Sequence, residues 1–432
     1  MRRLGPALEV RDFRLWWLAS LGMWMSLQML EVAIGWEVYA QHRSTLDLGW
    51  IGLAEFLPMF VLALPAGQLA DRVPRRAVFS GALLIGAGVG VGLAVVSGSG
   101  DTSVAVYLAL AVGAGISMAL GTPAARAMPP TLVGAELLAS AMTLRSIASQ
   151  AAQVAGPALG GLLYGISPSL VYALSAGACL AAAGCVLAMR PAAAADAADT
   201  AAPAGALPAG HGAARPPADV YGVLEGLRFV GRTQILLGAI LLDLLAVLFG
   251  GAVALLPVFA SSILHVGATG LGLLRAAPAV GALTAAAVIT RRPIARHAGR
   301  VLLTVVFLYG ACIVVFGLSR SYPLSLAALA VSGFVDLYSM NIRSTTVALA
   351  SPDRLRGRVN AVEMVFISAS NQLGYFESGF AAFLVGTVPA VVGGGVATMV
   401  IALSWRRLFP DLAAVDRLEQ IKPPPTVPVR AS

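Results

Sequence analysis

Long apolar stretches alternate with short polar segments along almost the whole chain. A helix that crosses a bilayer needs roughly 20 mostly apolar residues, because each residue rises about 1.5 Å through a hydrocarbon core of about 30 Å. Twelve stretches reach this length, which predicts an all-α integral membrane protein with twelve transmembrane helices. The predicted spans cover residues 13–39, 48–70, 77–97, 103–122, 138–164, 168–189, 235–260, 267–289, 301–318, 323–345, 359–383 and 388–408.

The spans form two groups of six, separated by residues 190–219. This segment is rich in Ala, Pro and Gly, has no apolar period and offers little bulk to bury, which is typical of a flexible cytoplasmic linker. We therefore expect two pseudo-symmetric six-helix halves, residues 1–189 and 220–409, and a cytoplasmic tail, residues 410–432. The second half is expected to begin with a short amphipathic helix at residues 221–232, on the membrane surface.

The two groups of spans repeat one pattern. Arg126 closes the fourth span and Arg343 closes the tenth, and a proline-containing segment follows each of them. The next helix then carries an embedded charge, Arg145 in the first half and Glu363 in the second. Two parallel six-helix halves related by an axis normal to the membrane are one of the known plans for transporters.

The distribution of charge predicts an orientation. Of the 432 residues, 58% are hydrophobic and 12% are charged, whereas a soluble domain carries about a quarter charged residues. The net charge of +8 does not indicate a nucleic-acid partner, because the arginines lie in short segments between apolar runs. With the N-terminus inside, Arg43 and Arg320 fall in outward loops, Arg145 and Arg275 fall within the membrane, and the other basic residues lie on the cytoplasmic side. We expect a multi-pass protein of the bacterial inner membrane with both termini cytoplasmic.

The sharpest local signal lies between the second and third spans. Residues 67–76 read Gly-Gln-Leu-Ala-Asp-Arg-Val-Pro-Arg-Arg, where the arginines can hold the segment at the cytoplasmic interface. An ordinary positive-inside loop is the alternative reading. The segment resembles the signature gate loop of the major facilitator superfamily, which implies that its acid lies near residues 357–360 of the other half; Pro74 departs from the usual glycine. The matching gate-loop residues are Gly67, Asp71, Arg72, Arg75 and Arg76.

A second motif lies in the fifth span. Gly156 and Gly160 share one helix face and allow close helix contact, while Pro157 removes a backbone donor and bends the helix. Together with Gly161, these residues resemble the core of the helix motif associated with exporters of the superfamily. Packing alone is the alternative explanation.

Four further segments, spread through nearly the whole chain, resemble one branch of that superfamily. They are similar to the enterobactin-exporter-like carriers, also called transmembrane secretion effectors. This resemblance implies proton-driven efflux of siderophores or drugs, and it does not fix the substrate of this chain. The segments are residues 36–39, 255–260, 270–274 and 356–360.

Several charged residues fall inside the predicted spans. A charge near the middle of a bilayer costs roughly 2.5–3.5 kcal/mol on insertion scales, so each should face the protein interior and find a partner. Glu55 in the second span receives no role from the sequence alone. The candidates for proton coupling or for lining a substrate cavity are Gln28, Glu31, Arg145, Asp243, Asp336 and Glu363.

These candidates allow different roles. Glu31 suits proton coupling or cation binding, because apolar surroundings favour the neutral form of a carboxyl group, and a structural ion pair is the alternative. Arg145 can neutralise an acid such as Glu363 or attract an anionic substrate. For Asp243, Asp336 and Glu363, structural ion pairs are the preferred interpretation.

Nothing in the sequence indicates a catalytic, cofactor or metal site. The three cysteines and four histidines show no metal-ligand spacing and no nucleophile motif, and the glycine-rich run at residues 86–90 lacks the lysine of a phosphate-binding loop. We therefore expect no cofactor, no metal and no enzyme activity, and an ion gradient as the source of energy.

The leading hypothesis is a secondary active exporter that acts as a monomer by alternating access. A proton moving inward would drive a siderophore-like or drug-like small molecule outward. An importer on the same fold, a polytopic membrane enzyme and a carrier-shaped sensor are the alternatives at this point.

Overall fold

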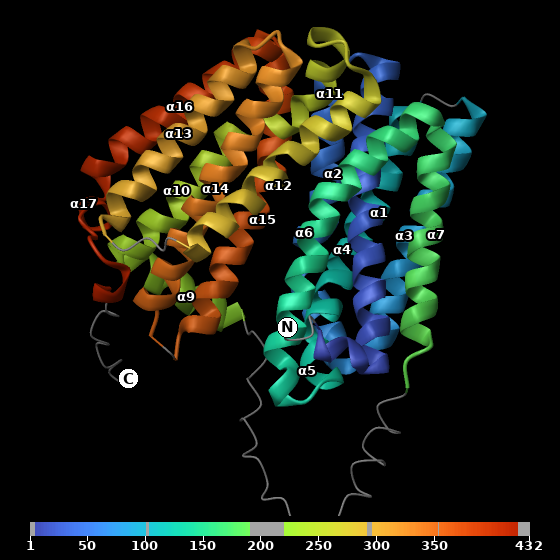
Figure 1. Cartoon of the computed structure of the whole chain (residues 1–432), viewed down its shortest axis with the longest axis horizontal. Helices are drawn as coiled ribbons and strands as arrows, with labels where there is room; N and C mark the ends of the chain where they lie inside the picture. Colours follow the sequence, from blue (N-terminus) through green and yellow to red (C-terminus); the bar gives the residue numbers. More distant parts are fainter. Residues whose placement is uncertain (1–4, 101–102, 191–219, 292–295, 353, 422–432) are drawn as a thin grey trace, which may run out of the picture.

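The chain folds as a bundle of long helices arranged in two groups that lie side by side (Figure 1). The computed structural model describes residues 5–100, 103–190, 220–291, 296–352 and 354–421, and it places their side chains except at residues 63–72, 220–224, 361 and 368–369. No β-strand occurs among the described residues. The predicted linker lies almost entirely outside this description.

The long helices correspond to the twelve predicted spans. The first group contains α1 (Arg11–His42), α2 (Thr45–Arg72), α3 (Arg75–Ser99), α4 (Val104–Ala127), α6 (Ala135–Ile166) and α7 (Pro168–Leu187). The second group contains α10 (Gln234–Gly250), α12 (Gly267–Arg291), α13 (Ala298–Leu318), α14 (Tyr322–Ala350), α15 (Arg356–Val385) and α16 (Thr387–Leu408).

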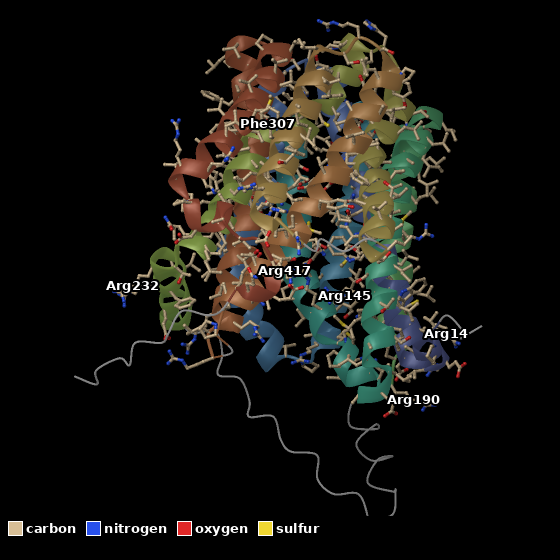
Figure 2. The ribbon with its side chains drawn as sticks, turned by 60° about the vertical axis from the view of Figure 1, so that its left-hand side comes forward. Arg14, Arg145, Arg190, Arg232, Phe307 and Arg417 are labelled. Atoms are coloured by element: carbon tan, nitrogen blue, oxygen red, sulfur yellow. The ribbon has the colours of Figure 1, made fainter. Side chains whose placement is uncertain are left out.

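Short elements join the long helices. In the second group, α9 (Val220–Arg232) precedes α10 and occupies the expected amphipathic segment. We call the side of the bundle where α7 ends and α9 lies the linker side, which is the lower side in Figure 1. Arg14, Arg190 and Arg232 all lie in the lower half of Figure 2. The remaining short elements are η1 (Pro6–Glu9), α5 (Pro129–Leu132), η2 (Ala252–Leu255), α11 (Leu256–Val258), η3 (Phe259–Ile263), α17 (Pro410–Ala413) and η4 (Leu418–Gln420).

The two groups repeat the same packing. In the first group α3 packs against α7, α2 against α4, and α1 against both α6 and α7. In the second group α13 packs against α16, α12 against α14, and α10 against both α15 and α16. The contacts between the groups form a matched pair as well, because α6 packs against α12 and α15 against α2. The structure is therefore two pseudo-symmetric six-helix halves.

Glycine pairs allow the halves to approach closely on the side opposite the linker. A Cβ atom on Gly272 of α12 would lie 3.0 Å from the Cα of Gly161 in α6. A Cβ atom on Gly379 of α15 would lie 2.9 Å from the Cα of Gly49 in α2. Lipid gives no hydrophobic drive for helix association, so close contact through small residues supplies the packing energy. The halves therefore meet where these four helices begin or end, away from the linker side.

The seventh span differs from the continuous helix that the sequence predicted. Its helix α10 ends at Gly250, and the chain continues through η2, α11 and η3 before α12 begins. The hydroxyl of Tyr309 donates to the Gly250 carbonyl at 3.2 Å, and that of Ser378 donates to the Gly251 carbonyl at 3.0 Å. A break at membrane depth is tolerated because neighbouring side chains satisfy the freed carbonyls.

Helices α6 and α15 make the main contacts between the halves together with α12 and α2. Ten described helical segments are long and apolar enough to cross a membrane on composition alone; α6 is not among them, and the described side chains of α15 form no continuous stretch of that length. Both are long, with 32 and 30 residues, and both lie in the contact between the halves. A helix that faces protein and a polar route needs fewer apolar residues than one that faces lipid.

The close contact between α6 and α12 predicts that two cysteines introduced there would form a disulfide. A Cβ at position 165 would lie 2.9 Å from the side-chain oxygen of Thr269, within reach of a bridge between cysteines at these positions. In a variant without the native cysteines, Gly165→Cys/Thr269→Cys should form an intramolecular disulfide on mild oxidation, measured by mass spectrometry. The control Gly177→Cys/Thr269→Cys should not, because the space around Gly177 is open. Equal cross-linking in both variants would contradict this packing.

Candidate functional site

Four side chains from four helices meet where the two halves touch. They are Glu31 of α1, Glu55 of α2, Arg275 of α12 and Tyr375 of α15, and we call them the inter-half cluster. Arg275 Nη2 donates to Glu31 Oε2, forming an ion pair that joins one half to the other. Glu55 and Tyr375 lie within electrostatic range of both charges. The four residues line a small cavity of about 50 Å³.

Helix register and small residues place this cluster near the middle of the bundle. Glu55 follows the start of α2 by ten residues, about 15 Å along the helix, which is half of a bilayer core. A Cβ on Gly115 of α4 would overlap the carbonyl oxygen of Glu55, so glycine there lets α2 lie against α4. A Cβ on Gly52 would lie 2.8 Å from that of Tyr375, so glycine also leaves room for the tyrosine.

The cluster holds more acid than base. The side chains of Arg275 and Glu31 are 11% and 21% exposed, so water screens the pair weakly. One guanidinium faces two carboxyl groups, and an additional negative charge at this depth is costly. A proton on one of the two carboxyl groups would balance the charge, and proton binding is the chemistry that this arrangement suits.

Sequence reasoning found these residues only in part. It selected Glu31 and placed Arg275 within the membrane, but it neither paired them nor assigned Glu55, and it overlooked Tyr375. An unpartnered arginine inside the eighth span was the available signal, because such a charge requires an acid on a neighbouring helix. The sequence did not indicate which of the embedded acids would be that partner.

Two other predicted site residues, Asp243 and Glu363, lie beside Arg343 within the second half. Arg343 Nη1 lies 2.7 Å from Asp243 Oδ1, and both side chains are about one-tenth exposed. Glu363 of α15 lies within electrostatic range of both. A cavity of about 240 Å³ between α10, α14 and α15 is lined in part by these three residues. Asp336 of α14 also interacts with Arg343 through space.

Arg145 does not neutralise Glu363, which was one of its two expected roles. The reason is geometric: Glu363 lies beside Asp243 and Arg343 of its own half. Within the part of the chain that the structure describes, no carboxylate lies within 4 Å of Arg145. Its charged neighbour is Arg126, whose guanidinium reaches Met364 Sδ of the other half at 3.5 Å. Figure 2 shows Arg145 in the lower half of the bundle.

The exporter-type motif of α6 packs against both halves. A Cβ on Gly156 would press on the Cβ of Gln28, and one on Gly160 would lie 2.9 Å from the Cα of Met29, both on α1. Gly161 instead faces α12 of the other half, and the Pro157 carbonyl approaches Gly272. Gln28 therefore lies between the motif and Glu31, one helical turn from the inter-half cluster.

A buried carboxylate in the first half escaped sequence reasoning. Glu37 of α1 is 3% exposed and accepts a hydrogen bond from the hydroxyl of Tyr172. Gln41 Nε2 lies 3.4 Å from Glu37 Oε1 and 3.2 Å from the hydroxyl of Tyr107. The segment at residues 36–39 was noticed only for its family resemblance, although an acid within an apolar run was a signal in itself.

The gate-loop residues are placed only in part. The side chains of Gly67, Asp71 and Arg72 lie outside the described residues, and so does the expected position of Asp71 against the start of α15. Arg75 Nη1 donates to the Ala127 carbonyl at 2.9 Å, and Arg76 donates to main-chain carbonyls at the end of α7, including that of Val186 at 3.2 Å. Both arginines thus tie helices of their own half together.

The segment that the gate loop was expected to meet has another described partner. Arg358, at the start of α15, forms an ion pair with Glu225 of α9. The carbonyl of Arg358 also lies against Gly226, where a Cβ would be 3.0 Å away. The amphipathic helix α9 is therefore held against the linker-side end of α15.

Among the described residues, no group of three or more His, Cys, Asp or Glu side chains could hold a metal ion. The three cysteines are all free thiols. The acids of the inter-half cluster have a guanidinium as their cationic partner, which is the pattern of an ion-pair site.

The sequence matches the transmembrane secretion effector family over residues 4–429. It is also 26% identical over 420 residues to the enterobactin exporter EntS of Citrobacter koseri, covering 96% of this chain and 94% of that protein. This confirms the branch suggested by the sequence motifs.

Solved structures of transporters share the fold. A bacterial homologue of the human lysosomal transporter Spinster, in an inward-facing and unoccupied conformation, has a TM-score of 0.69 at 17% identity, over 93% of this chain and 98% of that one. A POT family transporter has a TM-score of 0.71 at 11% identity, over 93% and 96%. A D-xylose–proton symporter has a TM-score of 0.66 at 12% identity, over 94% and 99%. The chain thus belongs to the transmembrane secretion effector family of the major facilitator superfamily, and it is a membrane transporter rather than an enzyme.

Proposed function

We propose that this transporter is a proton-coupled exporter of a siderophore-like or drug-like small molecule, working as a monomer in the bacterial inner membrane with both termini in the cytoplasm. The similarity to an enterobactin exporter over nearly the whole chain supports export. The observation that carries the coupling is the Glu31–Arg275 ion pair, because its two charges belong to different halves.

In this proposal, Glu31 loses its ion pair with Arg275 when the halves separate, and it binds a proton instead. While the halves are in contact, Arg275 and Glu31 form their ion pair. When the halves separate on the outer side, Arg275 withdraws, and an unpaired carboxylate in weakly polar surroundings favours proton uptake from outside. Closure of the outer side returns Arg275 to Glu31 and displaces the proton toward the cytoplasm. One proton then moves inward for each substrate that moves outward.

The substrate route lies between walls of opposite charge. Arg126 of the first half reaches Met364, which follows Glu363 in α15. Arg145 is the charged neighbour of Arg126, and no described carboxylate lies within 4 Å of either arginine. We infer that these two arginines receive the negatively charged part of the substrate. The cluster of Asp243, Arg343 and Glu363 would contact its positive or hydrogen-bonding part.

The central test is substrate accumulation in cells that contain or lack the protein. Export predicts lower accumulation in cells that contain it, and collapse of the proton gradient should remove the difference. Candidate substrates are a catecholate siderophore and a panel of cationic and anionic drugs. Higher accumulation would indicate an importer on the same fold, and a difference that ignores the proton gradient would exclude proton antiport.

Removal of Glu31 should uncouple transport. We expect Glu31→Gln to lose gradient-driven export while it still exchanges substrate down a concentration gradient, because the carboxyl that carries the proton is gone. The measurement is transport in proteoliposomes with and without an imposed pH gradient. Asp411→Asn, which alters an exposed acid of α17, should behave as wild type. Full gradient-driven export by Glu31→Gln would assign Glu31 a structural role.

Removal of Arg275 alone should be more harmful to stability than removal of the whole pair. Loss of one partner from a buried pair costs about 3–5 kcal/mol, because the other charge stays buried. Arg275→Gln should therefore lower the unfolding temperature of the purified protein more than Arg275→Gln/Glu31→Gln does. A double variant as unstable as Arg275→Gln would show that the two residues do not interact.

Arg145 should affect substrate binding more than turnover. We expect Arg145→Gln to raise the KM for anionic substrates roughly tenfold, the loss of about 1.4 kcal/mol from one charge-assisted contact, with a smaller effect on cationic ones. Arg145→Lys should retain part of the affinity because it keeps the charge. A KM that is equal for Gln and Lys variants and for both substrate classes would rule out this role.

A further inference from the structure

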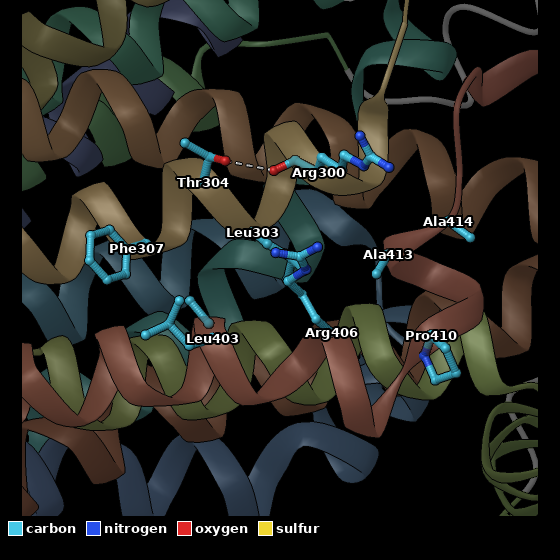
Figure 3. Close-up of a pocket in the computed structure, with 10 residues that line it drawn as sticks. Arg300, Leu303, Thr304, Phe307, Leu403, Arg406, Pro410, Ala413 and Ala414 are labelled. Carbon is cyan, nitrogen blue, oxygen red and sulfur yellow. Dashed lines mark hydrogen bonds between the residues drawn. The ribbon is translucent and has the colours of Figure 1, made fainter.

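A cavity of about 640 Å³ opens on the second half, away from the contact with the first half. It lies between α13 and α16 at their linker-side ends, where α17 closes one end (Figure 3). Neither α13 nor α16 takes part in the main contacts between the halves, which are made by α12 and α15. The cavity is therefore separate from the proposed substrate route. Its lining residues are Arg300, Leu303, Thr304, Phe307, Ala402, Leu403, Arg406, Pro410, Ala413 and Ala414.

The cavity results from the path that the chain takes after α16. Deeper in the bundle α13 and α16 are in close contact, since a Cβ on Gly310 would lie 2.6 Å from the Gly395 carbonyl oxygen. At the linker side the chain turns at Pro410 and crosses to the start of α13. There Ala298 N–H donates to the Asp416 carbonyl at 3.0 Å, and Gly299 N–H donates to the Val415 carbonyl at 2.9 Å. The crossing segment leaves a groove between the two helices.

The groove is basic at one end and apolar at the other. Arg300 is the third residue of α13 and Arg406 lies two residues before the end of α16, so both lie at the linker-side ends of helices apolar enough to cross a membrane. Phe307 follows Arg300 by seven residues, about 10 Å deeper in the membrane. In Figure 3 the side chain of Arg406 points from α16 toward α13, beside Leu303.

Among the described residues, the guanidinium groups of Arg300 and Arg406 form no ion pair with a carboxylate, since none lies within 4 Å of either group. The acid on the crossing segment, Asp416, accepts from the main-chain N–H of His297 at 3.0 Å and lies 3.7 Å from its imidazole. Asp411 on α17 is exposed and does not line the groove. The groove thus carries two positive charges available to a ligand.

We propose that this groove binds one phospholipid with an anionic headgroup. The phosphate groups of the lipid contact Arg300 and Arg406, and one acyl chain lies along Leu303, Phe307 and Leu403. Basic pockets between transmembrane helices at the cytoplasmic surface suit anionic headgroups, and arginine matches phosphate geometry with paired donors. A free phosphate ion would leave the apolar end of the groove empty, so a lipid fits the whole site.

The test counts lipids bound to the purified full-length protein by native mass spectrometry, during titration with phosphatidylglycerol or with phosphatidylcholine of the same acyl chains. Wild type should bind one phosphatidylglycerol with clear preference over phosphatidylcholine. Arg300→Gln/Arg406→Gln should weaken that binding roughly 30-fold, since each basic residue near a headgroup contributes about a fivefold factor. The matched control Arg407→Gln removes the neighbouring exposed arginine, which does not line the groove, and should bind as wild type.

A second variant distinguishes a groove that binds a lipid from a surface that only attracts negative charge. Thr304→Trp keeps both arginines but fills the exposed middle of the groove, so it should also lose the bound lipid. Inorganic phosphate alone should neither compete at millimolar concentration nor raise the unfolding temperature. Equal weakening by Arg407→Gln, unchanged binding by Thr304→Trp, or full competition by phosphate would each overturn the proposal.

Discussion

An arginine and a glutamate from opposite halves meet inside the membrane, and the rest of the structure is arranged around that contact. Each charge alone would be costly at this depth, and together Arg275 and Glu31 largely compensate each other. Their helices can approach because glycines line the neighbouring contacts between α6 and α12 and between α2 and α15. Those glycine contacts are apolar and symmetric, so they hold the halves together without selecting a protonation state. The ion pair is the charged contact, and it is the one that the proposed proton coupling uses.

The sequence predicted which residues lie in the membrane better than which residues meet there. Twelve spans, two halves and the embedded charges followed from the length of apolar runs, because one bilayer sets one length scale for all of them. The break after Gly250 was missed, since Tyr309 and Ser378, which satisfy the freed carbonyls, are distant in sequence. Helices α6 and α15 were predicted as spans in spite of their embedded charges, and both lie in the contact between the halves.

Partners of embedded charges depend on helix crossings that a single sequence does not record. Arg343 shares a helix face with Asp336, yet its ion pair is with Asp243 of α10. Arg275 and Glu31 are 244 positions apart, and several acids in other spans were equal candidates for Arg275. Glu363 was one suggested partner of Arg145, and the two residues follow equivalent arginines in the two halves, but Glu363 lies beside Asp243 and Arg343 of its own half. Equivalent positions in the repeat thus predict matching locations in the two halves, but they do not predict which residues are in contact.

The two charged clusters differ in what a rocking motion does to them. Asp243, Arg343 and Glu363 all belong to the second half, so they keep their partners if that half moves as one body. Glu31 and Arg275 belong to different halves, so the same motion must change their separation. In the proposed cycle, the group that binds the proton has to lose its partner when the halves move. Among the clusters described, the inter-half cluster meets that condition, because its two charges belong to different halves. In the proposed mechanism, the second-half cluster then contacts the substrate.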